Sequence, residues 1–319
     1  MALGAASATS GSASRVTLAR PPRKRRLSHT QVRRWVTAYA FLLPALVLMA
    51  VFTFYPIIMG MVIMFYDYTV FEPMEFVGFA NFSRAFADQD FHKSVLHSVE
   101  YIVVVPVLQI LSILVAVLVN RSLPGITFFR TAYYIPVVTS TVAVAISWKW
   151  LYNSNGILNY ALTSLGLIER PLYWLTSKEL ALPSVMMVTM WKGIGWYMVI
   201  YLAGLQSVPK ELEEAAAIDG ASRWRVIRHV TIPLLKPYVL FATFMSVMGA
   251  LQVFDEVFVM TGGGPLKSTL TMAVYQYYKA FGAFDFGYAA AIGMLMALMI
   301  LVFNIPVFRM LAKGGLKYY

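Results

Sequence analysis

The chain has 319 residues, of which 59% are hydrophobic and only 13% charged, and its mean hydropathy is +0.67. A soluble domain carries roughly a quarter charged residues, so this composition excludes an ordinary water-soluble globule and favours a protein surrounded by lipid. The chain has no cysteine, which excludes disulfides, thiolate metal sites and cysteine nucleophiles.

The N-terminal segment, residues 1–34, differs in composition from the rest of the chain. An Ala/Ser/Gly run precedes a cluster of five basic residues between Arg20 and Arg26, and apolar periodicity is lacking. Such a segment is expected to be a disordered tail. The 32 uncharged residues that follow, Trp35 to Tyr66, far exceed the roughly 7–15 residues of a signal-peptide core. They predict a retained membrane helix.

Six apolar stretches are long enough, or nearly so with one interruption, to cross about 30 Å of hydrocarbon as helices. They are Trp35–Tyr66, Tyr101–Asn120, Thr131–Trp148, Leu180–Pro209 with Lys192 inside it, Tyr238–Phe254 and Phe286–Phe308. Backbone groups in lipid must be bonded internally, which favours helices over open strands. We therefore predict an all-α integral membrane fold with six transmembrane helices over residues 35–310 and a short tail at 311–319. Kinks are expected at the prolines inside these spans, Pro44, Pro56, Pro106 and Pro136.

The distribution of Lys and Arg predicts the orientation. With the N-terminus in the cytosol, the inside segments 1–34, 120–130, 207–236 and 309–319 hold 18 basic residues, and the outside segments hold 7. The positive-inside rule thus places both termini in the cytosol. It also accounts for the net charge of +11 without a nucleic-acid partner.

The longest inside loop, residues 207–236, contains start and stop signals for two short helices. Acidic residues near Glu211 suit the start of a short helix, and Gly220 suits its C-terminal cap. Ser222 can cap a second helix through Val230, which Pro233 is expected to stop. Two short helices would form a knob with small alanine side chains. The alternative is a solvated loop that merely connects two spans.

The string from Glu214 to Pro233, with Glu-Ala-Ala, Gly220 and Val-Thr-Ile-Pro, resembles the EAA loop of ABC importer permeases. Further segments resemble the sugar and glycerol-phosphate branch of this family, the maltose-permease type: Leu205–Pro209, Phe254–Asp255, Thr261–Pro265, Gly287–Gly293 and Trp148–Trp150 with Gly156 and Asn159. The resemblance covers about residues 35–310. It implies a type I permease fold in a bacterial or archaeal plasma membrane.

The resemblance also implies partners. Members of this family pack against a second homologous permease above two ATPase subunits, and an extracytoplasmic binding protein delivers the solute. The EAA loop docks into the ATPase, so ATP and Mg would bind there and this chain would need no cofactor of its own and catalyse no reaction. The implied coupling residues are Glu214, Ala215, Ala216, Asp219, Gly220, Ala221 and Pro233.

The resemblance also implies that residues in the middle of the spans line a substrate path. The positions similar to the family's contacts are Val137 and Thr141 in the third span, Thr189, Lys192, Gly193 and Trp196 in the fourth, and Ser246, Ala250 and Val253 in the fifth. Gln252 and Asp255 extend this path toward the outer end. A lysine inside a span is costly unless it is paired or faces water. Lining the path and snorkelling to an interface both remain open for Lys192.

Other functions fit less well. Gly262–Ser268 lacks the glycine before lysine that a phosphate-binding loop requires, which leaves a tight outer turn. The four histidines have no metal-ligand spacing. A secondary transporter would carry inverted repeats and paired charges, and a membrane enzyme would need a catalytic cluster; neither pattern is seen. The prediction is half of an import path for a sugar or oligosaccharide, with a glycerol-3-phosphate-type solute as the alternative.

Overall fold

The computed structural model describes residues 29–120 and 124–314. The chain falls into two compact units, residues 1–56 and 57–319, and each is described by itself. The predicted all-α fold is confirmed, because helices make up nearly all of the regular structure and one two-stranded hairpin is the exception among the described residues.

The first unit contains helix α1, His29–Met49, and the π-helical turn Ala50–Phe54. Helix α1 begins six residues before the predicted boundary at Trp35, so residues 29–34 are helical where a disordered tail was expected. Their sequence, HTQVRR, contains neither Gly nor Pro, and the apolar helix simply extends back through it. The rest of the predicted tail lies outside the described residues.

Irregular turns precede three prolines. The π turn Ala50–Phe54 comes before Pro56 in α2 (Tyr55–Ile63), and the 3₁₀ turn Tyr101–Val103 comes before Pro106 in α5 (Val104–Val119). A third, the π turn Ile227–Thr231, comes before Pro233. Proline has no N–H and its ring crowds the preceding turn. A locally altered helical repeat accommodates both effects while the helix continues.

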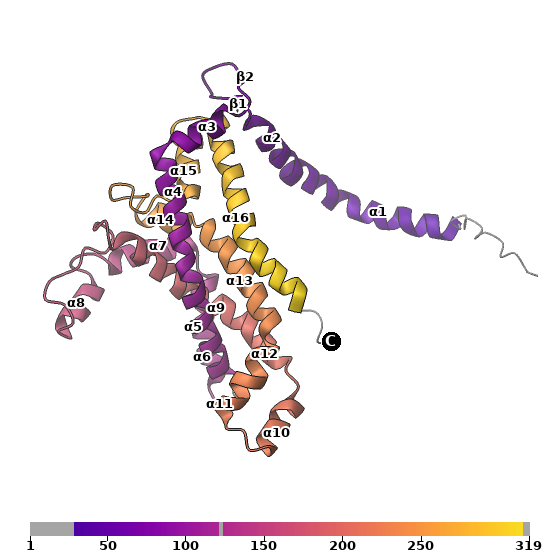
Figure 1. The fold of residues 1–319 in the computed structure, drawn as a ribbon, viewed down its shortest axis with the longest axis vertical. Coiled ribbons are helices and arrows are strands. Elements are labelled where there is room, and N and C mark those ends of the chain that lie inside the picture. Colours follow the sequence, from indigo (N-terminus) through magenta and orange to yellow (C-terminus); the bar gives the residue numbers. More distant parts are fainter. Residues whose placement is uncertain (1–28, 121–123, 315–319) are drawn as a thin grey trace, which may run out of the picture. The chain divides into compact units, whose positions relative to one another are not determined.

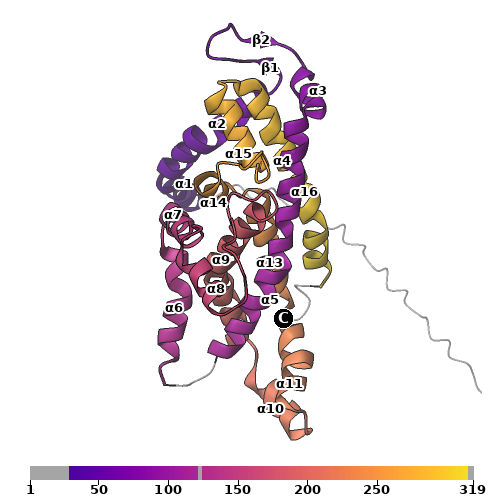
Figure 2. The ribbon, with the colours of Figure 1, turned by 90° about the vertical axis from the view of Figure 1, so that its left-hand side faces the viewer.

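The second unit carries the remaining elements. A hairpin of β1 (Tyr66–Asp67) and β2 (Glu75–Phe76) pairs Tyr66 with Phe76 and leads into α3 (Ala80–Ala87) and α4 (Gln89–Glu100). The helices that follow α5 are α6 (Ile126–Val138), α7 (Thr141–Leu151), α8 (Ile157–Ser164), α9 (Ala181–Gln206), α10 (Lys210–Ile218), α11 (Arg223–Val226), α12 (Ile232–Leu234), α13 (Lys236–Leu251), α14 (Asp255–Met260), α15 (Met272–Tyr277) and α16 (Phe286–Gly314). Figures 1 and 2 place α10 and α11 at one end of this unit and β1, β2, α3 and α15 at the other.

Five stretches of helix in the described residues are long and apolar enough to span a membrane: 33–63, 89–119, 181–206, 236–260 and 286–310. These match five of the six predicted spans. The predicted third span, Thr131–Trp148, is not one straight helix, because α6 and α7 meet at an angle of 99°. Thr139 and Ser140 between them have extended backbones, so the helical hydrogen bonds stop there. Counting the bent pair as one span gives six.

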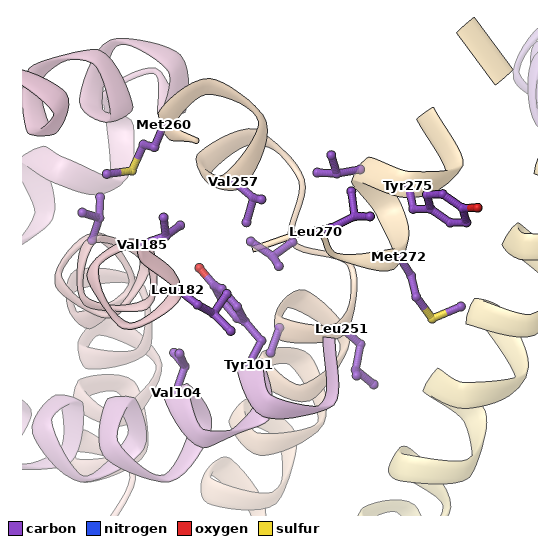
Figure 3. Packing of buried hydrophobic residues seen from close by; sticks show 14 of the residues in the cluster. Tyr101, Val104, Leu182, Val185, Leu251, Val257, Met260, Leu270, Met272 and Tyr275 are labelled. Atoms are coloured by element: carbon purple, nitrogen blue, oxygen red, sulfur yellow. The ribbon is translucent and has the colours of Figure 1, made fainter. Parts of the chain in front are cut away.

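The core of the second unit is an apolar cluster shared by several helices. Figure 3 shows Tyr101 and Val104 facing Leu182 and Val185 of α9, with Val257 of α14 close by. Helix α5 packs along α9, α13 along α16, and α6 along α9. Helices α6 and α9 approach closely at Gly195 of α9, where an added Cβ would lie 2.1 Å from the carbonyl oxygen of Tyr133 in α6. Glycine is therefore required there for the two helices to touch.

Candidate functional site

The segment between α9 and α13, residues 207–235, forms the end of the second unit that Figure 1 shows at the bottom. It contains α10 and α11, as the sequence predicted. The predicted limits of the first helix, Glu211 and Asp219, lie within one residue of the observed Lys210 and Ile218. The knob of two short helices is thus confirmed, although its role as a coupling element stays a prediction.

Gly220 ends α10 as predicted. Its φ of +80° lies in the left-handed region, which glycine adopts without the clash that a Cβ would cause. The N–H of Ala221 donates to the carbonyl oxygen of Ala216 at 3.0 Å. This bond across the left-handed glycine is the closing bond of a Schellman cap, which satisfies an otherwise free carbonyl at the helix end.

The predicted stop at Pro233 is wrong. The second helix passes from α11 through the π turn into α12, which includes Pro233 near its start, and ends at Leu234. The N–H of Ile232 donates to Ile227, five residues back. Widening the turn makes room for the proline ring, so the chain runs on almost without a break into α13.

Helices α10 and α11 expose apolar as well as charged side chains. Ile218 is 87% exposed and Trp224 63% exposed, and Leu212 is also exposed. Glu214, Ala215, Asp219 and Gly220 are exposed, Ala216 and Ala221 are half-buried, and Pro233 is exposed. A solvent-facing knob with large apolar groups at its tip is suited to contact another protein.

The second candidate site is a cavity of about 530 Å³, called here the central cavity. Helices α5, α9, α13 and α14 form most of its wall. Its lining residues are Val104, Val105, Leu108, Val137, Thr189, Lys192, Gly193, Trp196, Tyr197, Ser246, Gly249, Ala250, Gln252, Val253, Phe254, Asp255 and Glu256. Its size and its mixed apolar and polar lining are typical of small-molecule sites.

The structure brings together most of the residues of the predicted path. Those that line the central cavity are Thr189, Lys192, Gly193, Trp196, Ser246, Gln252 and Asp255, together with Val137, Ala250 and Val253. Thr141 does not line it. It begins α7, on the far side of the 99° bend from Val137, so the straight span that would have carried it inward does not exist. What these residues bind stays a prediction.

Several polar groups of the cavity are already engaged within the protein. The hydroxyl of Thr189 lies 2.6 Å from that of Tyr101 in the turn before α5. The hydroxyl of Ser246 accepts a hydrogen bond from Gln109 at 2.7 Å and donates to the carbonyl oxygen of Thr243. These hydroxyls hold α9 and α13 against α5, and less of their bonding capacity is left for a ligand.

Other polar groups face the cavity with their side chains unengaged. Among the described residues, Lys192, Gln252, Asp255 and Glu256 form no ion pair and no hydrogen bond to another side chain. Polar groups in a recess are rarely left without a partner. These four are therefore the groups that can bind a solute or water.

Aromatic side chains complete the lining. Trp196 is 46% exposed although it lines the cavity, so the cavity opens on the side of α9. Phe254 stacks on Phe258 with ring centroids 5.0 Å apart, and Tyr277 packs against both rings. This stack fixes the wall beside Asp255 and Glu256, while Trp196 presents a free ring face.

Sequence reasoning missed Tyr197 and Phe254 as wall residues, and it noted the carboxylate of Glu256 without assigning it to the path. A signal for Glu256 was present, because a carboxylate next to Asp255 at the end of an apolar span is costly in lipid. The sequence left open whether such charges sit at a helix end in water. The structure places both at the start of α14, facing the cavity.

The glycine-rich segment Gly262–Ser268 is a tight turn, as predicted. Gly262 and Gly263 have positive φ, and so do Leu266 and Lys267. The turn follows α14. Lys267 forms an ion pair with Asp90 of α4, which ties the turn to the bundle.

Comparison with known proteins gives one matching family model, described as the binding-protein-dependent transport system inner membrane component, over residues 90–312. The chain is 34% identical over 284 residues to the lactose transport system permease protein LacF of Rhizobium radiobacter, covering 87% of this chain and 95% of that protein. It is 35% identical over 314 residues to the diacetylchitobiose uptake system permease protein NgcF of Streptomyces coelicolor, covering 92% of this chain and 87% of that protein.

A solved structure has the same fold. It is a bacterial ABC transporter involved in the import of the acidic polysaccharide alginate, and one of its chains superimposes with a TM-score of 0.77 at 25% identity. The match covers 88% of this chain and 96% of that one.

Proposed function

This chain belongs to the family of binding-protein-dependent transport system inner membrane components, and from that premise we propose that it forms half of the path of an ATP-driven importer for a sugar or oligosaccharide. The family is one of membrane transport subunits without enzymatic activity of their own. The substrate class follows from the relatives, whose names specify lactose and diacetylchitobiose.

The observation that carries the proposal is the central cavity. It lies between helices that belong to candidate membrane spans, and it combines a tryptophan ring with unengaged amide, carboxylate and ammonium groups. Sugars present apolar ring faces that stack on aromatic side chains and hydroxyls that both donate and accept hydrogen bonds. A wall with Trp196, Gln252 and Lys192 offers both kinds of contact.

A second homologous permease is the partner that we propose for the open side of the cavity. Trp196 and Trp191, both on α9, are 46% and 42% exposed. Large aromatic rings that face outward beside a polar cavity are typical of a protein interface. Half of the solute contacts would then come from the partner.

We further propose that the segment with α10 and α11 faces the cytosol and docks on the partner ATPases. The excess of Lys and Arg in the segments predicted to lie inside supports the orientation, and the exposed Ile218 and Trp224 supply apolar contacts. ATP and Mg would bind on the ATPases, whose movement would reach the cavity through α9 and α13. An extracytoplasmic binding protein would deliver the solute to the opposite end of the second unit.

The test is uptake into proteoliposomes. The chain is reconstituted with its co-purifying subunits and binding protein, and a radiolabelled oligosaccharide mixture is offered outside. Uptake is expected with ATP enclosed and is expected to stop when either the ATPase or the binding protein is omitted. Uptake by the chain alone, driven by an ion gradient, would instead identify a secondary transporter.

A further inference from the structure

Three side chains with carboxyl or ammonium groups line the central cavity. Lys192 extends from α9, while Asp255 and Glu256 extend from the first turn of α14. The lining therefore carries one more carboxylate than ammonium group, and an excess of negative charge is expected when all three are ionised.

Lys192 attracts Glu256 electrostatically, but none of these charges lies in a close ion pair among the described residues. In the part of the chain that the structure describes, ion pairs form at Asp285 and Asp90, and none of the three cavity residues takes part in one. A carboxylate in a recess without an ion-pair partner has acceptor positions left for water or a ligand. The cavity thus presents hydrogen-bond acceptors to whatever enters.

When both carboxylates are ionised, Glu256 is expected to contribute more to this field than Asp255. Glu256 is half-buried, whereas Asp255 is exposed. A charge that is shielded from solvent acts more strongly on a neighbour, because less water and salt screen it. Lys192 is also half-buried and offsets only one of the two carboxylates.

We propose that the central cavity rejects anionic saccharides and accepts neutral or amine-bearing ones, and that Glu256 is the residue that sets this preference. The inference rests on the proposed sugar-import function and narrows its substrate class. A sugar hydroxyl donates to a carboxylate, and a sugar ammonium pairs with it. A uronate or a sugar phosphate brings a second negative charge and is repelled, which is specificity by exclusion.

The sign of the cavity's potential can be measured without knowing the solute, because the natural chain has no cysteine. Gly249 lines the cavity, and an added Cβ there meets no atom within 4 Å. A Gly249→Cys variant of the assembled importer is treated with two methanethiosulfonate reagents, one bearing trimethylammonium and one bearing sulfonate. Mass spectrometry of this chain then gives each modification rate. Ser164→Cys, exposed on α8, supplies the reference ratio of the two rates.

At position 249, the modification rate with the trimethylammonium reagent is divided by the rate with the sulfonate reagent. This ratio is expected to exceed the ratio at Ser164→Cys by about tenfold. Adding Glu256→Gln should bring the ratio close to the reference, and adding Asp255→Asn as well should reverse it, because Lys192 then acts alone. Glu169→Gln, on an exposed loop, should change nothing. Equal ratios at both cysteines, or no response to Glu256→Gln, would overturn the inference.

A second experiment tests the substrate preference directly by measuring uptake of saccharides by the intact importer. Cellobiouronic acid at excess is expected to leave uptake of the labelled oligosaccharides unaffected, and cellobiouronic acid itself should not accumulate. Its accumulation would overturn the charge inference while the sugar-import function stands. Failure of every saccharide to accumulate in the ATP-dependent assay would instead overturn the proposed function.

Discussion

Gly220 illustrates how one residue sets local geometry at the candidate coupling segment. Its φ of +80° is reached freely by glycine, is tolerated by asparagine, and costs other residues about 1–2 kcal/mol. Proline cannot adopt it at all, because its ring holds φ near −65°. The cap of α10 therefore depends on this position more than on any contact of its side chain.

Replacing Gly220 by proline is expected to abolish ATP-driven uptake while the protein stays in the membrane, because α10 loses the bond from Ala221 to Ala216. Gly220→Asn keeps the left-handed backbone and should retain most uptake. Both are checked by uptake assays normalised to the amount of importer in the membrane. Normal uptake by the proline variant would remove α10 from the coupling mechanism.

Lys192 allows a prediction about substrate contact. Lys192→Met keeps the length of the side chain and removes its charge and three donors. For a neutral sugar, losing a hydrogen bond from a charged donor costs about 1.5–3 kcal/mol, so the half-saturating concentration for uptake should rise by at least about tenfold. In the alternative case of a phosphorylated solute, which the charge inference excludes, uptake would collapse. Unchanged kinetics would show that Lys192 does not touch the solute.

At the scale of elements, a buried hydrogen-bond network joins three helices beside the cavity. Gln109 of α5 donates to Ser246 of α13 at 2.7 Å and accepts from the hydroxyl of Tyr201 in α9. All three side chains are buried. Because Ser246 also lines the cavity, the network connects the packing of the spans to the shape of the site.

Gln109→Leu is expected to lower the free energy of unfolding by about 1–3 kcal/mol, since Tyr201 is left with an unsatisfied buried hydroxyl. The matched control is Ser112→Ala on the same helix. Ser112 is buried and its hydroxyl has no partner among the described residues, so its removal should be neutral or stabilising. Thermal denaturation of the purified importer measures both. Equal losses of thermal stability in the two variants would contradict a role for the network.

At this scale, some features of the helices could be predicted from the sequence and others could not. Long apolar stretches predict spans because lipid requires them, and the residues around Gly220 predict the cap because left-handed backbone requires glycine. The break at Thr139–Ser140 was not predictable, because nothing local forbids a helix there and the packing of α6 and α7 against different neighbours decides. That break is why Thr141 does not line the central cavity, and its place in the substrate path stays a prediction.

The direction of the Glu256 side chain could not be predicted for a related reason. Its neighbour Asp255 has the same chemistry, and only the bend of the chain at Phe254, whose φ and ψ are −131° and −62°, directs both carboxylates to the cavity. The burial and the direction of these carboxylate side chains depend on the tertiary structure.

At the scale of the whole molecule, Asp88 joins the helices at the end away from α10. It caps α4 by accepting from the N–H groups of Asp90 and Phe91, and its other oxygen accepts from the hydroxyls of Tyr275 and Tyr288. Burial raises the pKa of Asp88, but these hydrogen bonds outweigh it and hold the pKa below its ordinary value of 3.8. The ionised form is therefore the one that the fold stabilises.

A pH dependence follows, with its sign set by that lowered pKa. Stability from Asp88 is fully present above the ordinary value of 3.8 and is lost as pH falls through the lower folded value. Asp88→Asn should therefore be less stable than the natural chain at pH 7, and the difference should shrink below about pH 4. Thermal denaturation from pH 3 to 7 checks it. A difference that grows on acidification would contradict this account.

The most direct test of the central claim, that the solute passes through the central cavity, uses the cysteine-free background. The importer carrying Gly249→Cys is modified to completion with a bulky maleimide, reconstituted, and assayed for ATP-driven oligosaccharide uptake beside the natural chain and Ser164→Cys treated in the same way. The account predicts that uptake falls to background in the Gly249→Cys importer and is retained in the other two. Full uptake after complete modification at position 249 would contradict it.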